Sequence, residues 1–195
     1  GAVDRIEKLL ASSDNGRILK EGISTVIVGK PNAGKSSLLN TLLGEERAIV
    51  TEIAGTTRDV LEEQINLNGI ILNVIDTAGI RDTDDIVEKI GVDKARKYVK
   101  DADLILYVVD ASTNLDENDR EIMELLHGRR TIVLLNKSDL MPLTTAEDIR
   151  AHVDKDCPVI SISAREQKGI DVFIEQIREM FFRGEVTFND EVYIT

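Results

Sequence analysis

A glycine-rich segment, residues 29–36, contains the residue types that bind phosphate. It reads Gly-Lys-Pro-Asn-Ala-Gly-Lys-Ser, which matches the P-loop pattern G-x-x-x-x-G-K-S. The glycines allow backbone N–H groups to turn towards phosphate oxygens, and the N-terminus of a following helix adds partial positive charge. We therefore predict that Lys35 acts on the outer phosphates and that the Ser36 hydroxyl binds Mg²⁺. The other predicted contacts in this segment are Asn32, Ala33, Gly34 and Ser37.

A second segment, residues 136–139 (Asn-Lys-Ser-Asp), can distinguish guanine from adenine. Guanine presents N1–H and its N2 amino group as adjacent donors, and the Asp139 carboxylate can accept from both. Adenine would leave that carboxylate buried and unpaired, which is costly. Asn136 either bonds the other edge of the base or ties the loop, and the Lys137 stem can cover the ring. Backbone N–H groups further along complete the predicted pocket, at Ser163, Ala164 and Arg165.

Two segments between these motifs have the composition of magnesium and switch loops. Residues 76–79 read Asp-Thr-Ala-Gly, so Asp76 can hold Mg²⁺ through a water and Gly79 can present its N–H to the γ-phosphate during catalysis. Residues 51–59 are long, polar and glycine-containing, which is typical of a segment ordered by nucleotide. Thr51 is predicted to contact the nucleotide, and Thr57 or Thr56 to bring a hydroxyl to Mg²⁺. The alternative is a surface loop with no ligand role.

The three motifs in this order indicate a GTP-binding P-loop domain that resembles the Ras-like fold. In Ras-type proteins a Gln after D-x-x-G orients the attacking water, but here that residue is Ile80. Either another group positions the water and offsets the charge of the transition state, or the domain hydrolyses GTP slowly.

The elements that would position these loops alternate along the chain. Apolar or β-branched runs predict strands at residues 23–28, 60–67, 70–75, 104–109, 131–135 and 159–163, with Asn68-Gly69 as a hairpin turn. Helical spacing predicts helices at residues 36–43, 86–100, 117–126, 145–153 and 169–181. We therefore expect an α/β fold with a six-stranded, mostly parallel sheet, one antiparallel edge strand and helices on both faces. Ligands in such folds bind at the carboxyl ends of the strands.

Charge and composition exclude several other classes of protein. The 195 residues include 24 Lys and Arg and 36 Asp and Glu, which gives a net charge of −12. This charge argues against a protein that binds nucleic acid or an anionic membrane by charge alone. The single Cys excludes an internal disulfide and a metal site with several Cys ligands, and the presence of only two His argues against a His-based metal site. Apolar runs are too short to span a bilayer and no signal peptide pattern opens the chain, so we expect a cytoplasmic protein.

Three stretches, residues 31–40, 55–59 and 76–81, resemble the TrmE–Era–EngA group of bacterial GTPases. Within this group, residues 19–22 and 86–92 are most similar to the tRNA-modification family MnmE, also called TrmE. The resemblance covers nearly the whole chain, but the family's folate-binding domain, helical domain and C-terminal cysteine motif are not in it. The resemblance therefore implies a G domain at residues 18–184, with stubs or linkers of the helical domain at 1–17 and 185–195.

The resemblance also implies a potassium-dependent mechanism. Asn32 matches the family's K⁺ ligand, and backbone carbonyls at Thr51, Ile53 and Thr56 would complete the cation site. Glu88 matches the family's catalytic acid, which orients the attacking water through a bridging water. G domains of this family pair across their switch regions in the transition state. The parent protein works with the flavoprotein MnmG on the wobble uridine of tRNA, whereas this domain would grip neither nucleic acid nor membrane directly.

Several alternatives stay open at this point. Asn32 could be a turn residue, and Glu88 could be one more solvated acid in an acidic segment. A ribosome-assembly GTPase of the EngA or Era type would share the same motifs. An alternative from a different functional class is a nucleotide-gated binding module that hydrolyses little GTP by itself.

Overall fold

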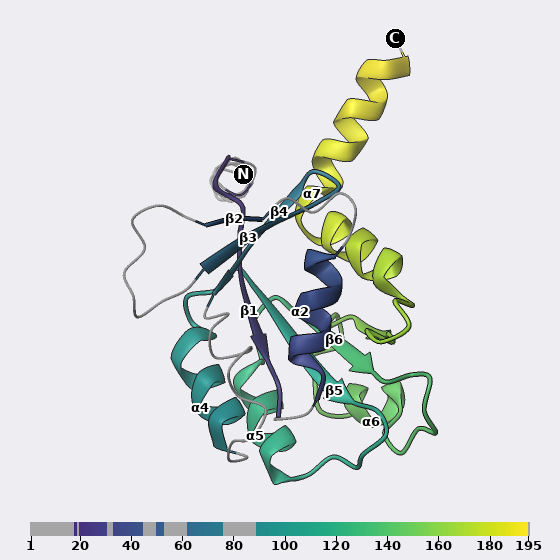
Figure 1. Cartoon of the computed structure of the whole chain (residues 1–195). Coiled ribbons are helices and arrows are strands. Elements are labelled where there is room, and N and C mark those ends of the chain that lie inside the picture. Colours follow the sequence, from purple (N-terminus) through teal and green to yellow (C-terminus); the bar gives the residue numbers. More distant parts are fainter. Residues whose placement is uncertain are drawn as a thin grey trace, which may run out of the picture.

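A single mixed β-sheet, with helices on both faces, forms the centre of the computed structural model (Figure 1). The structure describes residues 18, 20–30, 33–44, 50–52, 62–75 and 89–194. Its elements in chain order are β1 (Ile23–Val28), α2 (Lys35–Leu43), β2 (Val50–Glu52), β3 (Glu62–Leu67), β4 (Ile70–Ile75), α4 (Lys89–Tyr98), β5 (Leu104–Asp110), α5 (Glu117–Leu125), β6 (Thr131–Asn136), α6 (Ala146–Arg150), β7 (Val159–Ser161) and α7 (Ile170–Ile194).

The strands lie in the order β2-β3-β4-β1-β5-β6-β7. β1 pairs in parallel with β4 and β5, and the parallel pairing continues through β6 to β7. Among the described strands, β3 alone runs opposite to the others, because it is antiparallel to both β4 and β2. The predicted α/β fold is confirmed and all six predicted strands are present. The three-residue β2 was too short to be predicted, and it places the antiparallel strand second from the edge rather than at the edge.

Two apolar cores, one on each face of the sheet, explain why β5 is apolar at successive positions. Alternate residues of β5 from Leu104 to Val108 pack in one core with α2 and α7. The residues between them, from Ile105 to Val109, pack in the other core with α4 and α5. Because β5 is buried along its whole length, its sequence is continuously apolar until Asp110. The sheet is thereby fixed between two helical layers.

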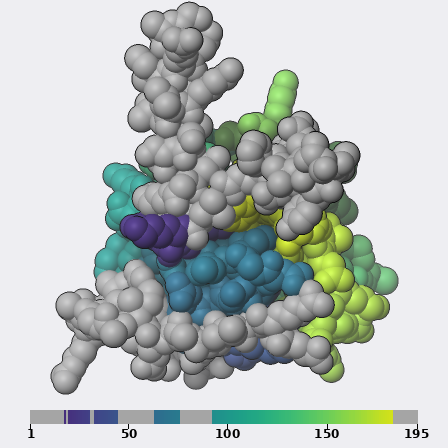
Figure 2. Space-filling model, turned by 90° about the horizontal axis from the view of Figure 1, so that it is seen from above, coloured from purple at the N-terminus to yellow at the C-terminus, as the bar shows by residue number. Residues whose placement is uncertain are grey.

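The β3–β4 hairpin has the turn that its sequence predicts. Asn68 and Gly69 both have positive φ, 57° and 92°, as a type I′ turn requires. The Asn66 side chain accepts a hydrogen bond from the Gly69 N–H at 2.8 Å and so stabilises the turn. Figure 2, which looks down on the top of Figure 1, shows residues 62–75 at the surface next to α7. Leu67 and Ile177 belong to the same core, so the hairpin and α7 are packed together.

Helix ends agree with the sequence where capping residues are present and differ where they are not. α5 begins at Glu117, as predicted, and Asp116 and Asp119 form a capping box at its start. α6 is shorter than predicted, because the His152 N–H bonds to the Ile149 carbonyl in a tight final turn. α7 continues through Gly184, which costs a helix only about 1 kcal/mol. Neither α7 nor any other helix in the described part of the chain is long and apolar enough to cross a membrane.

Candidate nucleotide-binding site

The predicted site segments that the structure describes meet at one edge of the sheet, where the parallel strands end. The P-loop segment (residues 29–36) follows β1, and residues 136–139, called the guanine segment below, begin at the last residue of β6. The segment that ends in Arg165 follows β7. These strands are neighbours or near neighbours in the sheet, with β5 between β1 and β6. Figure 1 shows this edge at the bottom of the molecule, with α2 rising from it. The fold therefore gathers loops that are more than 100 residues apart in the sequence.

Close backbone packing explains the two glycines of the P-loop. A Cβ at Gly29 would lie 2.5 Å from the Val108 carbonyl oxygen of β5, so no side chain fits there. Gly34 has φ of 104° and forms the N-cap of α2, a conformation that favours glycine. A Cβ at Gly34 would also collide with the side-chain amide of Asn136. The loop is thus pressed against β5 on one side and the guanine segment on the other.

Lys35 is a half-buried cation at the first position of α2. Its Nζ donates a hydrogen bond to the Gly29 carbonyl at 2.7 Å, so the side chain folds back along the loop. Burial, together with the nearby charge of Lys94, lowers the pKa of Lys35 to about 8. Within the described residues no carboxylate pairs with the Lys35 ammonium. The surroundings of Lys35 therefore favour the binding of an anion.

Asn136 connects three loops through its side chain, which is only 3% exposed. Its Nδ2 donates to the carbonyl of Ala33 in the P-loop at 3.0 Å, and its Oδ1 accepts from the N–H of Ala164 at 3.1 Å. The Thr41 hydroxyl of α2 also donates to the Ala164 carbonyl, at 2.9 Å. Of the two roles that the sequence left open for Asn136, the structure has the amide tying the loops.

A pocket of about 350 Å³ lies between the P-loop and the guanine segment. The Asp139 carboxylate is exposed at this pocket, and its Oδ1 accepts a hydrogen bond from the Ser163 hydroxyl at 2.9 Å. Ser163 is fully buried, and its Oγ accepts from the Glu166 N–H at 3.2 Å. The predicted residues that line the pocket are Gly34, Ser37, Asn136, Lys137, Asp139, Ser163 and Arg165, and Leu140 joins them. The pocket thus presents an oriented carboxylate beside apolar and backbone surface.

Lys137 is held by an acid that the sequence analysis missed. Its Nζ donates to Asp110 Oδ2 at 2.7 Å, and Asp110 Oδ1 accepts from the backbone and hydroxyl of Ser112. Although burial raises the pKa of Asp110, the hydrogen bonds from Lys137 and Ser112 bring it below its ordinary value. Asp110 is the one acidic residue of the apolar strand β5 and lies at its carboxyl end, where ligands bind in such folds. This position was the one feature of the sequence that could have identified Asp110 as part of the site.

Of the other predicted site residues, the structure describes Ser36 and the backbone of Thr51. Ser36 is half-buried in the first turn of α2, and Thr51 lies in β2, of which only the backbone is described. Seven lie outside the described residues: Asn32, Ile53, Thr56, Thr57, Asp76, Gly79 and Glu88. In the part of the chain that the structure describes, no group of three His, Cys, Asp or Glu residues could hold a metal ion. The Mg²⁺ site, the K⁺ site and the catalytic acid therefore stay predictions.

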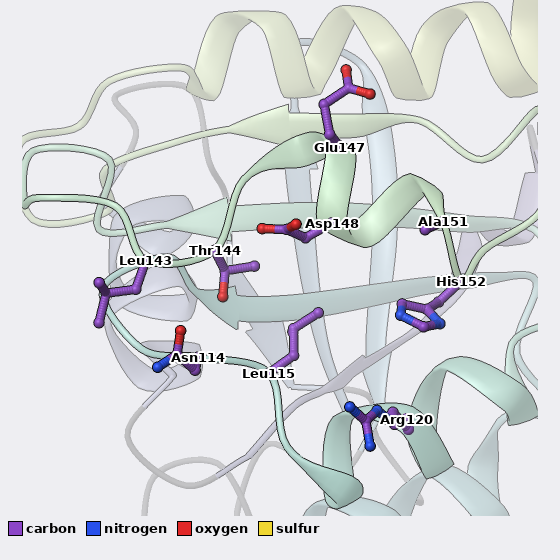
Figure 3. Close-up of a pocket in the computed structure, with 9 residues that line it drawn as sticks. All are labelled: Asn114, Leu115, Arg120, Leu143, Thr144, Glu147, Asp148, Ala151 and His152. Carbon is purple, nitrogen blue, oxygen red and sulfur yellow. The ribbon is translucent and has the colours of Figure 1, made fainter.

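A second cleft, of about 440 Å³, lies between the loop that connects β5 to α5 and the segment around α6 (Figure 3). Leu115 and Arg120 line it from one side and Thr144 and His152 from the other, whereas Glu147 points away from it. Among the described residues that line it are none of the predicted site residues. The cleft is therefore separate from the nucleotide pocket.

Comparison with known proteins gives relatives along the whole chain. The chain is 57% identical over 195 residues to the tRNA modification GTPase MnmE of Lachnoclostridium phytofermentans, covering 100% of this chain and 42% of that protein. It is 53% identical over 190 residues to the MnmE of Clostridioides difficile, covering 97% of this chain and 41% of that protein. These matches confirm the resemblance to MnmE seen in the sequence. The chain spans less than half the length of these relatives.

Solved structures and a family model agree with this result. The G domain of the T. maritima FeoB iron transporter is 26% identical with a TM-score of 0.54, over 82% of this chain and 98% of that one. Aquifex aeolicus Era bound to GDP and AlF4⁻ is 28% identical with a TM-score of 0.52, over 80% of this chain and 55% of that one. A model described as "50S ribosome-binding GTPase" matches residues 24–137. Because the match spans more than half of the chain, the chain belongs to this 50S ribosome-binding GTPase family.

Proposed function

We propose that this chain is a potassium-stimulated GTP-binding and GTP-hydrolysing domain of a longer, cytoplasmic protein that modifies the wobble uridine of tRNA. The observation that carries the nucleotide part is the Asn136 amide, which joins the P-loop to the loop of Ala164. This link sets a cation with no acid partner among the described residues, Lys35, and an oriented carboxylate, Asp139, in one site. Family membership supports GTP as the ligand, and the names of the MnmE relatives support the tRNA context.

The residues present fit a nucleotide with Mg²⁺. Lys35 supplies positive charge where the β- and γ-phosphates of a P-loop ligand lie. The half-buried Ser36 adjoins it, and a hydroxyl oxygen is a ligand type that Mg²⁺ accepts. In our proposal Thr57 and Asp76 complete this set, Asp76 through a water. Bound Mg²⁺ would neutralise charge on the β- and γ-phosphate oxygens.

Hydrolysis in our proposal uses K⁺ and Glu88 in place of an arginine finger and a Gln. Ile80 follows the D-x-x-G motif and cannot orient water. Asn32 and the carbonyls of Thr51, Ile53 and Thr56 would supply oxygen ligands to K⁺. A second G domain docked over the switch segments would order them and exclude water from the site.

The first prediction concerns the monovalent cation. Phosphate release from GTP should be about 10- to 100-fold faster in KCl than in NaCl of equal ionic strength, because the cation replaces part of the charge of an arginine finger. Light scattering should show a monomer with GDP in both salts. With GDP and aluminium fluoride, a dimer should form in KCl and not in NaCl. A monomer in all conditions, or a dimer indifferent to the cation, would contradict the potassium mechanism.

The second prediction separates hydrolysis from binding. Glu88→Ala should lower GTP turnover in KCl by at least about tenfold, as expected for loss of a group that orients water. GDP affinity should stay unchanged, because the side chain would act only on the attacking water, through a bridging water, and would not touch the nucleotide. Asp85→Ala, in the same acidic segment, is the matched control and should keep normal turnover. Wild-type turnover in both variants would show that Glu88 is only a solvated acid and has no role in hydrolysis.

The partner proposal follows from the MnmE relatives, which span more than twice this chain's length. We propose that the parent protein acts with the flavoprotein MnmG and with tRNA. A second candidate is a GTPase that acts on the ribosome, since the family model is described as ribosome-binding and a 30% identical Era was solved with MgGDPNP and a segment of 16S ribosomal RNA. Loss of wobble-uridine modification in cells lacking the parent gene, with normal ribosomal subunit profiles, would favour the tRNA role.

A further inference from the structure

The P-loop contains two lysines whose surroundings are opposite. Lys35 has no carboxylate partner among the described residues, whereas Lys30 Nζ lies 2.8 Å from Asp119 Oδ2 and 3.1 Å from Asp116 Oδ2. The Lys30 side chain is only 17% exposed. Although burial lowers the pKa of Lys30, hydrogen bonds to Asp119 and Asp116 bring it above its ordinary value. The two carboxylates therefore already compensate the charge of Lys30, so Lys35, and not Lys30, is the P-loop lysine that is placed to bind a phosphate.

The two acids that hold Lys30 are themselves fixed in place. Asp119 is 1% exposed, and its Oδ1 accepts a hydrogen bond from the Tyr107 hydroxyl of β5 at 2.6 Å. Its Oδ2 also accepts from the Asp116 N–H at 3.0 Å, and the Asp116 carboxylate accepts from the Asp119 N–H at 3.2 Å. This reciprocal pair is the capping box of α5. Lys30 thus bonds to a rigid corner made by β5 and the start of α5.

We propose that Lys30 is a positioning residue, which tethers the start of the P-loop to α5 and thereby slows the release of bound nucleotide. This inference rests on the proposed nucleotide-binding function. β5 also holds the guanine segment, through the ion pair of Asp110 with Lys137. One strand therefore supports both ligand loops, through Tyr107 for the phosphates and Asp110 for the base.

The physical effect of the tether is preorganisation. A phosphate loop binds through backbone N–H groups, so its affinity depends on the loop holding one shape before the ligand arrives. Lys30 follows Gly29, which is already pressed against Val108, and the ion pairs extend that fixed region by one residue. Without them the loop would lose more conformational freedom on binding, and the nucleotide would leave sooner.

The test measures dissociation of fluorescent mant-GDP from four forms of the 195-residue chain. Lys30→Met removes both ion pairs and should release the nucleotide about tenfold faster than wild type, since part of their stabilisation is carried into the bound state. Lys30→Arg should restore slow release, because a guanidinium can bond both acids. Lys30→Met also leaves the buried Asp119 carboxylate without a cation, which destabilises the fold. The double variant Lys30→Met/Asp119→Asn removes that charge, so its melting temperature should recover while release stays fast.

The outcomes separate positioning from simple stability. If release slows in the double variant as its melting temperature recovers, Lys30 has a structural role only and the proposal is wrong. Release from Lys30→Met at the wild-type rate would also overturn it. Failure of wild-type chain to bind mant-GDP at all would instead overturn the proposed function. As a second readout, bound GDP should slow hydrogen exchange at the Asp119 N–H in wild type, and to a smaller extent in Lys30→Met.

Discussion

Replacing Lys35 with alanine should reduce GDP affinity by about 10²-fold or more, one of the two largest binding effects that we expect from a single substitution in this chain. The Lys35 ammonium is the one P-loop charge that no acid compensates among the described residues, and its hydrogen bond to the Gly29 carbonyl holds it along the loop. Phosphate oxygens would supply the missing negative charge. Titration calorimetry with GDP measures the change directly.

The same substitution should leave the nucleotide-free fold intact. Burial of Lys35 beside the charge of Lys94 disfavours its ammonium, so removing it relieves an unfavourable interaction. We therefore expect an unchanged or higher melting temperature for Lys35→Ala without nucleotide. Lys100→Ala, at an exposed position, is the matched control for the loss of one positive charge. Wild-type affinity in Lys35→Ala would contradict the assignment of the phosphate site.

The lowered pKa of Lys35 also predicts how binding changes with pH. In the free chain this pKa is about 8, so Lys35 loses its proton as the pH rises above 8. Bound phosphates favour the charged form and raise the pKa, so binding above pH 8 must take up a proton. GDP affinity should accordingly fall as the pH rises from 8, by up to about tenfold per pH unit. Calorimetry at pH 8.5 in two buffers of different ionisation enthalpy should detect proton uptake by wild type and none by Lys35→Ala.

The sequence was most informative where local chemistry fixes the backbone. Gly34 has a positive φ at the N-cap of α2, a conformation that favours glycine, and Asn68-Gly69 fits a type I′ turn. Such constraints act within a few residues, so a pattern reveals them. The continuous apolar run of β5 likewise predicts a strand that is covered on both faces.

Contacts between distant residues could not be predicted in this way. Lys30 and Asp116 are 86 residues apart, and Lys137 and Asp110 are 27 apart. No local pattern distinguishes these acids from the many solvated ones in a chain of net charge −12. Only the strand order β1-β5-β6 brings each acid to its lysine. The same holds for Asn136, whose two partners come from the loops after β1 and β7.

Replacing Asp139 with asparagine should exchange guanine for xanthine as the preferred base. Guanine presents two donors to the carboxylate, whereas xanthine presents N1–H and, in place of the amino group, a carbonyl oxygen. An amide matches xanthine with one acceptor and one donor, but it sets its NH₂ against the guanine amino group. We expect GDP affinity to fall by about 10²-fold or more, and xanthosine diphosphate affinity to rise above that of GDP.

Ser163 determines which way the new amide faces. The Ser163 Oγ already accepts from the Glu166 N–H, so its own hydrogen is donated to Asp139 Oδ1. In Asp139→Asn that hydrogen should hold the amide oxygen at the Oδ1 position, which leaves the NH₂ where the other carboxylate oxygen was. The amide of the variant is therefore held in one orientation before the base arrives.

A control variant tests whether the carboxylate itself carries the selectivity. Ser163→Ala keeps the Asp139 charge and removes only the bond that orients it, so it should weaken GDP binding by less than about tenfold and keep the preference for guanine. Competition of mant-GDP with GDP, xanthosine diphosphate and ADP measures all three preferences in each variant. If Asp139→Asn still prefers GDP, the base does not meet this carboxylate and the pocket between Gly34 and Arg165 is not the guanine site. If Ser163→Ala loses the guanine preference as fully as Asp139→Asn, orientation of the carboxylate by Ser163, and not its charge alone, determines which base the site accepts.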